Sequence, residues 1–168
     1  MAKIAIITGS GSGIGRAAAL ALLKNGYKVV LAGRRKEALE ETASMAGNNA
    51  PNALAVPTDV TKRDDIVALF AKVKETFGRL DLLFNNAGIS PKGPDGARLG
   101  ILDSDMDTWG RVLNVNLVST ALLARGPGQG NAGLLVALAG IALALWALVL
   151  AAMSLGGLHE GGLGVVIY

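Results

Sequence analysis

Residues 8–15, TGSGSGIG, are the stretch of this chain whose residue types and spacing point most directly to chemistry. They follow a short apolar segment, residues 3–7, and precede an alanine- and leucine-rich segment, residues 16–24. This order predicts a turn between a strand and a helix. The first turn of a helix leaves backbone N–H groups unpaired and carries partial positive charge, so it suits an anion. Because glycine has no side chain to block a close approach, the stretch predicts a site for the phosphates of a dinucleotide.

The glycine spacing indicates which kind of dinucleotide site this is. Three glycines read G-x-x-x-G-x-G, and no register of the stretch matches the G-x-G-x-x-G of the usual Rossmann fingerprint. With a threonine in front, TGxxxGxG resembles the short-chain dehydrogenase/reductase family. The alternative is a turn that only reverses the chain. The resemblance implies that the cofactor is bound by Thr8, Gly9, Ser10, Ser12, Gly13, Ile14 and Gly15.

A basic pair follows the next predicted strand, residues 28–32. A site that prefers NAD usually has an acidic residue about 20 residues after the glycines, which binds the ribose 2′-hydroxyl. This chain has Gly33, Arg34 and Arg35 there. Guanidinium groups pair with a 2′-phosphate and no carboxylate is present to repel it, so the pattern predicts NADP in preference to NAD. The alternative is that Arg34 and Arg35 only solvate the start of the next helix.

A second motif, NNAG at residues 85–88, follows the apolar segment 80–84. NNAG after a fourth strand resembles the second signature of the same family. The resemblance implies that Ala87 and Gly88 let the backbone approach the nicotinamide ribose. It also implies that Asn86 braces the central sheet by hydrogen bonds. Two motifs in this order extend the resemblance from residue 1 to about residue 124.

Three further residues have roles implied only by the resemblance. Asp59 and Val60 follow the third predicted strand, and in the family such a pair borders the adenine ring, with the acid facing its exocyclic amine. The alternative is that Asp59 is a turn or cap residue. Asn116 lies in a V-N-L context that matches a family asparagine, which kinks its helix and holds a water in the proton relay, whereas Asn114 does not match. The alternative for Asn116 is an ordinary polar residue on a helix side.

The hydropathy pattern supplies the elements that would position these motifs. Strands are predicted over residues 3–7, 28–32, 53–57 and 80–84. Helices are predicted over residues 16–24, 36–47, 61–77 and 105–123, with capping boxes that pair Thr61 with Asp64 and Ser104 with Asp107. The expected fold is therefore an α/β, doubly wound, mainly parallel Rossmann-type domain over residues 1–124.

The resemblance ends near residue 124. The family uses a Tyr to exchange a proton with the substrate oxygen, a Lys to lower the pKa of that Tyr and grip the nicotinamide ribose, and a Ser to orient the carbonyl. Here the last lysine is Lys92, and the only tyrosine after Tyr27 is Tyr168. Asn116 is thus the one catalytic position that matches. The family activity is NADP-dependent hydride transfer between an alcohol and a carbonyl, and we expect no turnover by these 168 residues.

Composition changes abruptly at the same point, which separates residues 1–124 from an apolar tail, residues 125–168. All but one of the 16 Lys and Arg residues precede the tail, and residues 133–155 carry no charge. A helix of that length could span a bilayer, so one interpretation is a membrane anchor. A second is an apolar helix or strand that covers the edge of a truncated sheet. A third is a read-through segment from a shifted frame or an aberrant junction. If residues 133–140 are a degenerate fifth strand, the place of the family serine holds Ala or Gly.

Composition also limits the other functions that this chain could have. The net charge is +3, and basic residues are mostly interleaved with acidic ones, so no nucleic-acid surface is predicted. Cysteine is absent, which excludes disulfides and thiol chemistry, and no metal site is predicted. We expect a cytoplasmic protein that binds the dinucleotide cofactor, and a small-molecule substrate only if the active site is intact. The alternative is a non-catalytic nucleotide-binding or membrane-tethered module. The oligomeric state is not predicted.

Overall fold

The computed structural model describes residues 1–93, 96–97, 99, 103–126 and 135–138, and the described strands form a five-stranded sheet in the order β3-β2-β1-β4-β5. Every neighbouring pair of these strands is parallel. This confirms the predicted α/β fold of the Rossmann type. The strands are β1 (Ile4–Thr8), β2 (Lys28–Gly33), β3 (Ala53–Pro57), β4 (Leu82–Asn85) and β5 (Leu135–Leu138).

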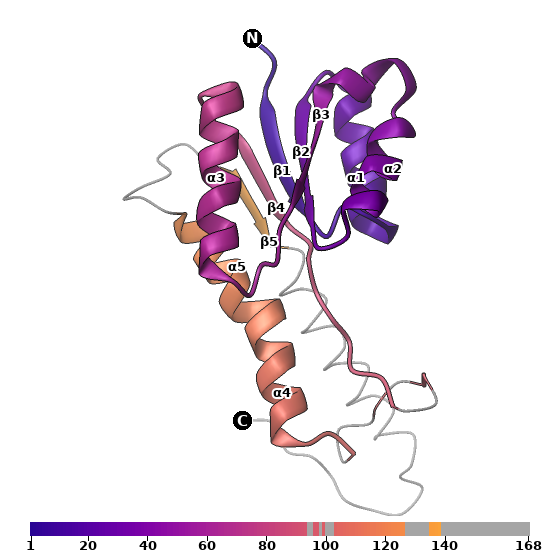
Figure 1. The fold of residues 1–168 in the computed structure, drawn as a ribbon, viewed down its shortest axis with the longest axis vertical. Coiled ribbons are helices and arrows are strands. Elements are labelled where there is room, and N and C mark those ends of the chain that lie inside the picture. The colour runs from indigo at the N-terminus through magenta and orange to yellow at the C-terminus, as the bar shows by residue number, and fades with distance from the viewer. Residues whose placement is uncertain (94–95, 98, 100–102, 127–134, 139–168) are drawn as a thin grey trace, which may run out of the picture.

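Helices cover both faces of the sheet. In Figure 1, α1 and α2 lie on one face, and α3 and α5 lie on the other. The α-helices are α1 (Gly13–Lys24), α2 (Lys36–Ser44), α3 (Arg63–Phe77), α4 (Met106–Leu113) and α5 (Ser119–Arg125). A 3-10 helix, η1 (Gly47–Asn52), follows α2, and a π-helix, η2 (Asn114–Val118), joins α4 to α5.

Two apolar clusters hold these layers together. Ile4 and Ile6 of β1 pack with residues of α3 and α5, whereas Ala5 and Ile7 pack with residues of α1 and α2. Alternate residues of a strand point to opposite faces, so a central strand with helices on both sides must be apolar throughout. All of β1 is buried, which fixes the position of Thr8 at its carboxyl end.

The order of the strands decides where a ligand can bind. The chain runs outward from β1 to β2 and β3, and then crosses to β4 on the other side of β1. In open α/β sheets, the crevice at the carboxyl ends of the strands on either side of such a reversal is the usual binding place. The glycine-rich stretch begins at the last residue of β1 and the NNAG motif at the last residue of β4, so the topology places both sequence motifs at this reversal.

The start of α3 corrects one predicted capping box. The N-cap residue is Lys62, and its side chain makes no capping hydrogen bond. The predicted cap residue, Thr61, instead donates its hydroxyl to Oδ1 of Asp59 at 2.7 Å. A carboxylate is a stronger acceptor than a neutral group, so the hydroxyl of Thr61 bonds to Asp59, outside the helix. The box between Thr61 and Asp64 is therefore not formed.

The helix predicted over residues 105–123 is divided into α4, η2 and α5. Asp105 is the N-cap residue rather than Ser104, and its carboxylate accepts a hydrogen bond from the backbone N–H of Thr108 at 2.7 Å. The cap is thus shifted by one residue from the predicted box. The π-helix contains Asn116, and a π-helical turn distorts a helix locally. The kink that the family resemblance implied there stays a prediction.

The strand β5 lies within the apolar tail. Its backbone pairs in parallel with β4, from Leu82 opposite Leu135 to Asn85 opposite Leu138. This strand extends the sheet beyond β4, which is the place that one interpretation of the tail assigned to it. None of the described helices is long and apolar enough to cross a membrane. Most of residues 133–155 lie outside the described residues, so the membrane anchor stays a prediction.

Candidate functional site

The glycine-rich loop and the NNAG motif are joined by hydrogen bonds in both directions. Oγ1 of Thr8 accepts the backbone N–H groups of Asn86 and Ala87, each at 3.0 Å. Nδ2 of Asn86 donates to the carbonyl oxygen of Thr8 at 3.0 Å and to that of Gly9 at 3.3 Å. Thr8 is 1% exposed, so these bonds are shielded from water. The turns after β1 and β4 therefore form one connected unit.

Three positions of the loop require glycine, for two different structural reasons. A Cβ on Gly9 would lie 3.0 Å from Cα of Ala87, and a Cβ on Gly15 would overlap the carbonyl oxygen of Gly9 and lie 2.5 Å from Nδ2 of Asn86. These two glycines allow the close approach of the two turns. Gly13 has a φ of +55°, and nothing lies within 4 Å of the position of its Cβ. The space beside Gly13 is thus open to a ligand.

The N-terminus of α1, where Gly13 lies, has unpaired donors. The helix begins at Gly13, and its first backbone bond runs from Arg16 N to Ser12 O at 3.2 Å. The N–H groups of residues 13–15 precede that bond and have no carbonyl partner within the helix. Ser12 makes no capping hydrogen bond, and the first turn of α1 has no acidic residue. This cradle of donors fits the pyrophosphate of a dinucleotide.

Besides Thr8, two further predicted cofactor contacts have side chains that point into the protein. Ser10 is 0% exposed, and its hydroxyl lies 3.4 Å from the carbonyl oxygen of Ala32 at the end of β2. Val60 is 6% exposed and belongs to the core cluster on the α3 side of the sheet. The structure therefore brings the backbone of these residues to the carboxyl edge of the sheet, but not their side chains.

The ends of β2 and β3 bring together the charged residues of the predicted adenosine site. Oδ1 of Asp59 accepts the hydroxyl of Thr61 and the backbone N–H of the same residue, at 2.7 and 3.0 Å. These hydrogen bonds, with a smaller effect of the nearby Arg34 charge, lower the pKa of Asp59. Arg34 follows β2 and is exposed, whereas Arg35 is the N-cap residue of α2. Within the described residues, neither arginine forms a salt bridge.

Asn116 holds the loop that follows the NNAG motif. Its Oδ1 accepts the backbone N–H of Ile89 at 2.8 Å, and its Nδ2 donates to the carbonyl oxygen of Ile89 at 2.9 Å. A Cβ on Gly88 would lie 3.3 Å from this Oδ1. Asn114 is exposed. The π-helix thus presents Asn116 to the same edge of the sheet, where its side chain fixes the backbone after Gly88.

Sequence reasoning missed a group that holds the glycine-rich loop from the side of α2. Nη2 of Arg16 donates to the carbonyl oxygen of Gly11 at 2.6 Å and to Oε2 of Glu41 at 2.7 Å. Its Nε donates to Oγ1 of Thr42 at 3.0 Å. The side chains of Arg16, Glu41 and Thr42 belong to no motif, because the two helices that carry them meet only in the folded chain. Thr42 lies three residues after the buried Leu39, so the helical periodicity of α2 is the signal that could have drawn attention to it.

The first asparagine of NNAG was also missed. Asn85 ends β4 and is 1% exposed, and neither polar atom of its side chain has a hydrogen-bond partner among the described residues. Buried amides are normally paired, so this position is unusual. The family resemblance assigned a role only to the second asparagine of the motif.

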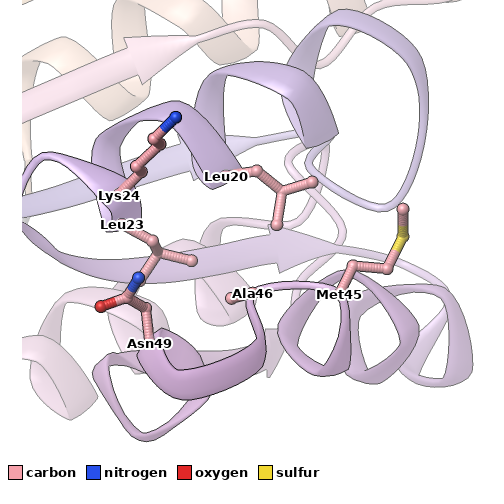
Figure 2. Close-up of a pocket in the computed structure, with 6 residues that line it drawn as sticks. All are labelled: Leu20, Leu23, Lys24, Met45, Ala46 and Asn49. Atoms are coloured by element: carbon pink, nitrogen blue, oxygen red, sulfur yellow. The ribbon is translucent and has the colours of Figure 1, made fainter.

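A shallow pocket in the described part of the chain lies away from these residues. It has a volume of about 350 Å³ and opens between the second half of α1 and the segment that follows α2 (Figure 2). None of the predicted site residues lines it. The glycine-rich loop is at the opposite end of α1, so the candidate site is an open cradle rather than this pocket. The lining residues are Leu20, Leu23, Lys24, Met45, Ala46 and Asn49.

Sequence comparisons match the part of the chain that forms this site. The family described as short chain dehydrogenase matches residues 3–128. An uncharacterized oxidoreductase from Staphylococcus aureus (strain MRSA252) is 40% identical over 125 residues, which are 73% of this chain and 50% of the relative. One from Listeria monocytogenes is 42% identical over 115 residues, which are 68% of this chain and 44% of the relative. The chain thus spans about half the length of the curated relatives it matches.

Solved structures resemble the same part. A 3-ketoacyl-(acyl-carrier-protein) reductase from Brucella melitensis, complexed with NADH, has a TM-score of 0.65 and 35% sequence identity. The match covers 73% of this chain and 47% of that one. A short chain dehydrogenase/reductase from Burkholderia phymatum, in complex with NAD, has a TM-score of 0.65 and 35% identity, and the match covers 74% and 42% of the two chains.

Proposed function

The chain belongs to the short-chain dehydrogenase family, and on this premise we propose that it binds NADP(H), in preference to NAD(H), at the carboxyl edge of its sheet. One observation carries the proposal. The glycine-rich loop and the NNAG motif are joined through Thr8 and Asn86, and the space beside Gly13 at the N-terminus of α1 is open. The matches to oxidoreductases support a nicotinamide dinucleotide as the ligand of this site.

The N-terminus of α1 binds the pyrophosphate in this proposal. Backbone N–H groups of residues 13–15 donate to phosphate oxygens, and the partial positive charge of the helix end adds to the attraction. Gly13 leaves room for the phosphates because its Cβ position is open. Ser12 is exposed beside these amides and supplies a hydroxyl. Ile14, which is 60% exposed, covers the side of the cofactor with an apolar surface.

The preference for NADP(H) rests on the residues at the start of α2. Arg34 pairs with the 2′-phosphate, because its exposed guanidinium has no salt-bridge partner within the described residues and follows directly on β2. Arg35 assists from the N-cap position. Lys36 is paired with Glu40 at 3.5 Å and contributes less. The two solved relatives were crystallised with NADH and NAD, so the preference depends on this chain's own residues.

The remaining predicted residues hold the two ends of the cofactor. Asp59 faces the exocyclic amine of adenine as a carboxylate, and the backbone at Val60 borders the ring. Ala87 and Gly88 bring backbone close to the nicotinamide ribose, and Asn116 keeps that backbone in place through Ile89. When bound, the nicotinamide supplies hydride chemistry, which in the whole protein would interconvert an alcohol and a carbonyl.

We also propose that the 168 residues do not turn over substrate by the family mechanism. Proton transfer to the substrate oxygen needs a positioned acid. No lysine follows Lys92 and no tyrosine lies between Tyr27 and Tyr168, so the Tyr-x-x-x-Lys pair is missing from the sequence. The chain therefore retains the residues that bind and orient the cofactor, and of the catalytic positions only Asn116.

Calorimetric titration of the purified chain with NADPH and, separately, with NADH tests the binding. We expect tighter binding of NADPH by at least about tenfold, the scale of one charge-assisted pair that NADH cannot form. Equal affinities would contradict the preference, and binding of neither would contradict the proposal as a whole. A parallel assay of NADPH oxidation with a panel of carbonyl compounds tests the absence of turnover, which a measurable rate would refute.

A further inference from the structure

The loop between β1 and α1 is attached to α2 directly through the carbonyl group of Ser10, and indirectly through that of Gly11, which bonds to Arg16 of α1. The hydroxyl of Thr42 lies 3.0 Å from the carbonyl oxygen of Ser10 and 2.9 Å from that of Ala38 in its own helix, so the two carbonyls share its proton. Nη2 of Arg16 donates to the carbonyl oxygen of Gly11 at 2.6 Å. Thr42 is 0% exposed. A Cβ on Gly11 would lie 3.0 Å from Cβ of Ala38, so the loop is seated directly on α2. The carbonyl of Ser10 therefore points towards α2, and that of Gly11 points towards the guanidinium of Arg16, which is itself bonded to Glu41 of α2.

The direction of these carbonyls matters for an anion. A phosphate over the N-terminus of α1 is attracted by N–H groups and repelled by carbonyl oxygens, which carry partial negative charge. Gly11 is followed directly by Ser12, the N-cap residue of α1. A loop that was free to rotate its peptide groups could turn either carbonyl towards the phosphates. The contacts with Arg16 and Thr42 oppose this rotation.

Arg16 is suited to this task by the geometry of its guanidinium. Nε donates to Thr42, Nη2 donates to Gly11 and Glu41, and Nη1 donates to Oε1 of Glu41 at 3.3 Å. A planar group with fixed donor directions can serve these partners together, whereas the single ammonium of a lysine cannot. The side chain of Arg16 is 21% exposed, and its charge is balanced by Glu41.

We propose that Arg16 and Thr42 are positioning residues for cofactor binding, which hold the carbonyls of Ser10 and Gly11 away from the pyrophosphate. Glu41 supports them by orienting the guanidinium of Arg16. The inference rests on the proposed function, because it concerns the same dinucleotide site. It predicts that the clamp formed by these three residues strengthens binding of the pyrophosphate, which NADPH and NADH share, and does not affect binding of the 2′-phosphate.

Thr42→Val and Arg16→Met in the full chain test the inference by titration with NADPH, NADH and 2′-AMP. We expect both variants to bind NADPH and NADH about tenfold more weakly, the scale of one or two buried hydrogen bonds, with an unchanged ratio of the two affinities. Binding of 2′-AMP, which has no pyrophosphate, stays within about twofold. Thr42→Ser keeps the hydroxyl and is the matched control for Thr42→Val. Arg16→Lys keeps the charge but lacks the planar group of donors, so we expect it to bind both dinucleotides as weakly as Arg16→Met does.

If Thr42→Val and Arg16→Met fail to fold, Glu41→Gln is the alternative test, because the Glu41 side chain is 60% exposed. We expect a loss of about threefold for both dinucleotides, and none for Glu40→Gln, which removes a charge from the same helix but belongs to the pair with Lys36. Full dinucleotide affinity in Thr42→Val or Arg16→Met, or an equal loss for 2′-AMP, would overturn the inference alone. If the unsubstituted chain bound no dinucleotide, the proposed function and this inference would fail together.

Discussion

The two ends of the candidate cofactor site are held in different ways. At the pyrophosphate end, Thr8 and Ser10 are buried, and the loop is tied to the NNAG motif and to α2 by hydrogen bonds. At the adenosine end, Arg34 and Arg35 are exposed and form no salt bridge within the described residues. The first end is preorganised, and the second can adjust to its ligand. We infer that the first sets whether a dinucleotide binds, and the second sets which one.

Gly15→Ala should have the largest effect on stability and binding, because it changes the packing of the preorganised end directly. The new Cβ would overlap the carbonyl oxygen of Gly9 and the amide of Asn86, so the two turns would have to separate. We expect a stability loss of about 3 kcal/mol or more and no measurable dinucleotide binding. Urea unfolding and calorimetry measure the two effects. Gly110→Ala is the matched control, since no atom lies within 4 Å of its Cβ position, and unchanged binding in Gly15→Ala would contradict the packing argument.

Thr8→Val keeps the shape of the side chain but removes the acceptor of two backbone N–H groups. The amides of Asn86 and Ala87 would then be left without this partner in a buried place. We expect a loss of about 2 kcal/mol in the free energy of unfolding, measured in urea, and weaker binding of NADPH and NADH alike. Thr8→Ser should retain most of the stability. Wild-type stability in the valine variant would show that the link between the two turns is dispensable.

Arg34→Ala addresses the adjustable end and should change selectivity with little change in stability. We expect NADPH affinity to fall about tenfold, with NADH affinity within about twofold of the original. Arg35→Ala should have a smaller effect, because Arg35 is the N-cap residue of α2 and lies one position further from β2. Calorimetric titration of both variants measures the difference. A parallel loss for NADH would mean that Arg34 acts on the shared part of the cofactor.

The smallest effect concerns pH, through Asp59. Its pKa in the folded chain is lowered, first by the hydrogen bonds from Thr61, relative to the unfolded value of about 3.9. A depressed pKa contributes stability that is present above the unfolded value and lost as the pH falls through the folded one. We expect Asp59→Asn to lose less stability than the original chain between about pH 5 and pH 3, measured by urea unfolding. Parallel curves for the two proteins would exclude this contribution.

The family motifs were visible in the sequence because each is short and local. The glycine spacing and NNAG need no knowledge of distant contacts, and apolar runs between them indicated β1 to β4 in their order. Side-chain directions at the site were not visible in the same way. Ser10 and Val60 belong to the matched motifs, yet their side chains are buried, because the path of the backbone after a strand decides which way a side chain points.

The sequence by itself determined the fold class, the strand order along the chain and the positions where a dinucleotide site would be built. It could do so because hydrophobic periodicity and glycine requirements act over a few neighbouring residues. Only the tertiary structure decided how these pieces are held. Thr8 bonds to a backbone amide 78 positions later, Thr42 supports the loop from another helix, and residues 135–138 pair with β4. Such contacts depend on packing between segments that are distant in the chain, and a linear pattern does not encode them locally.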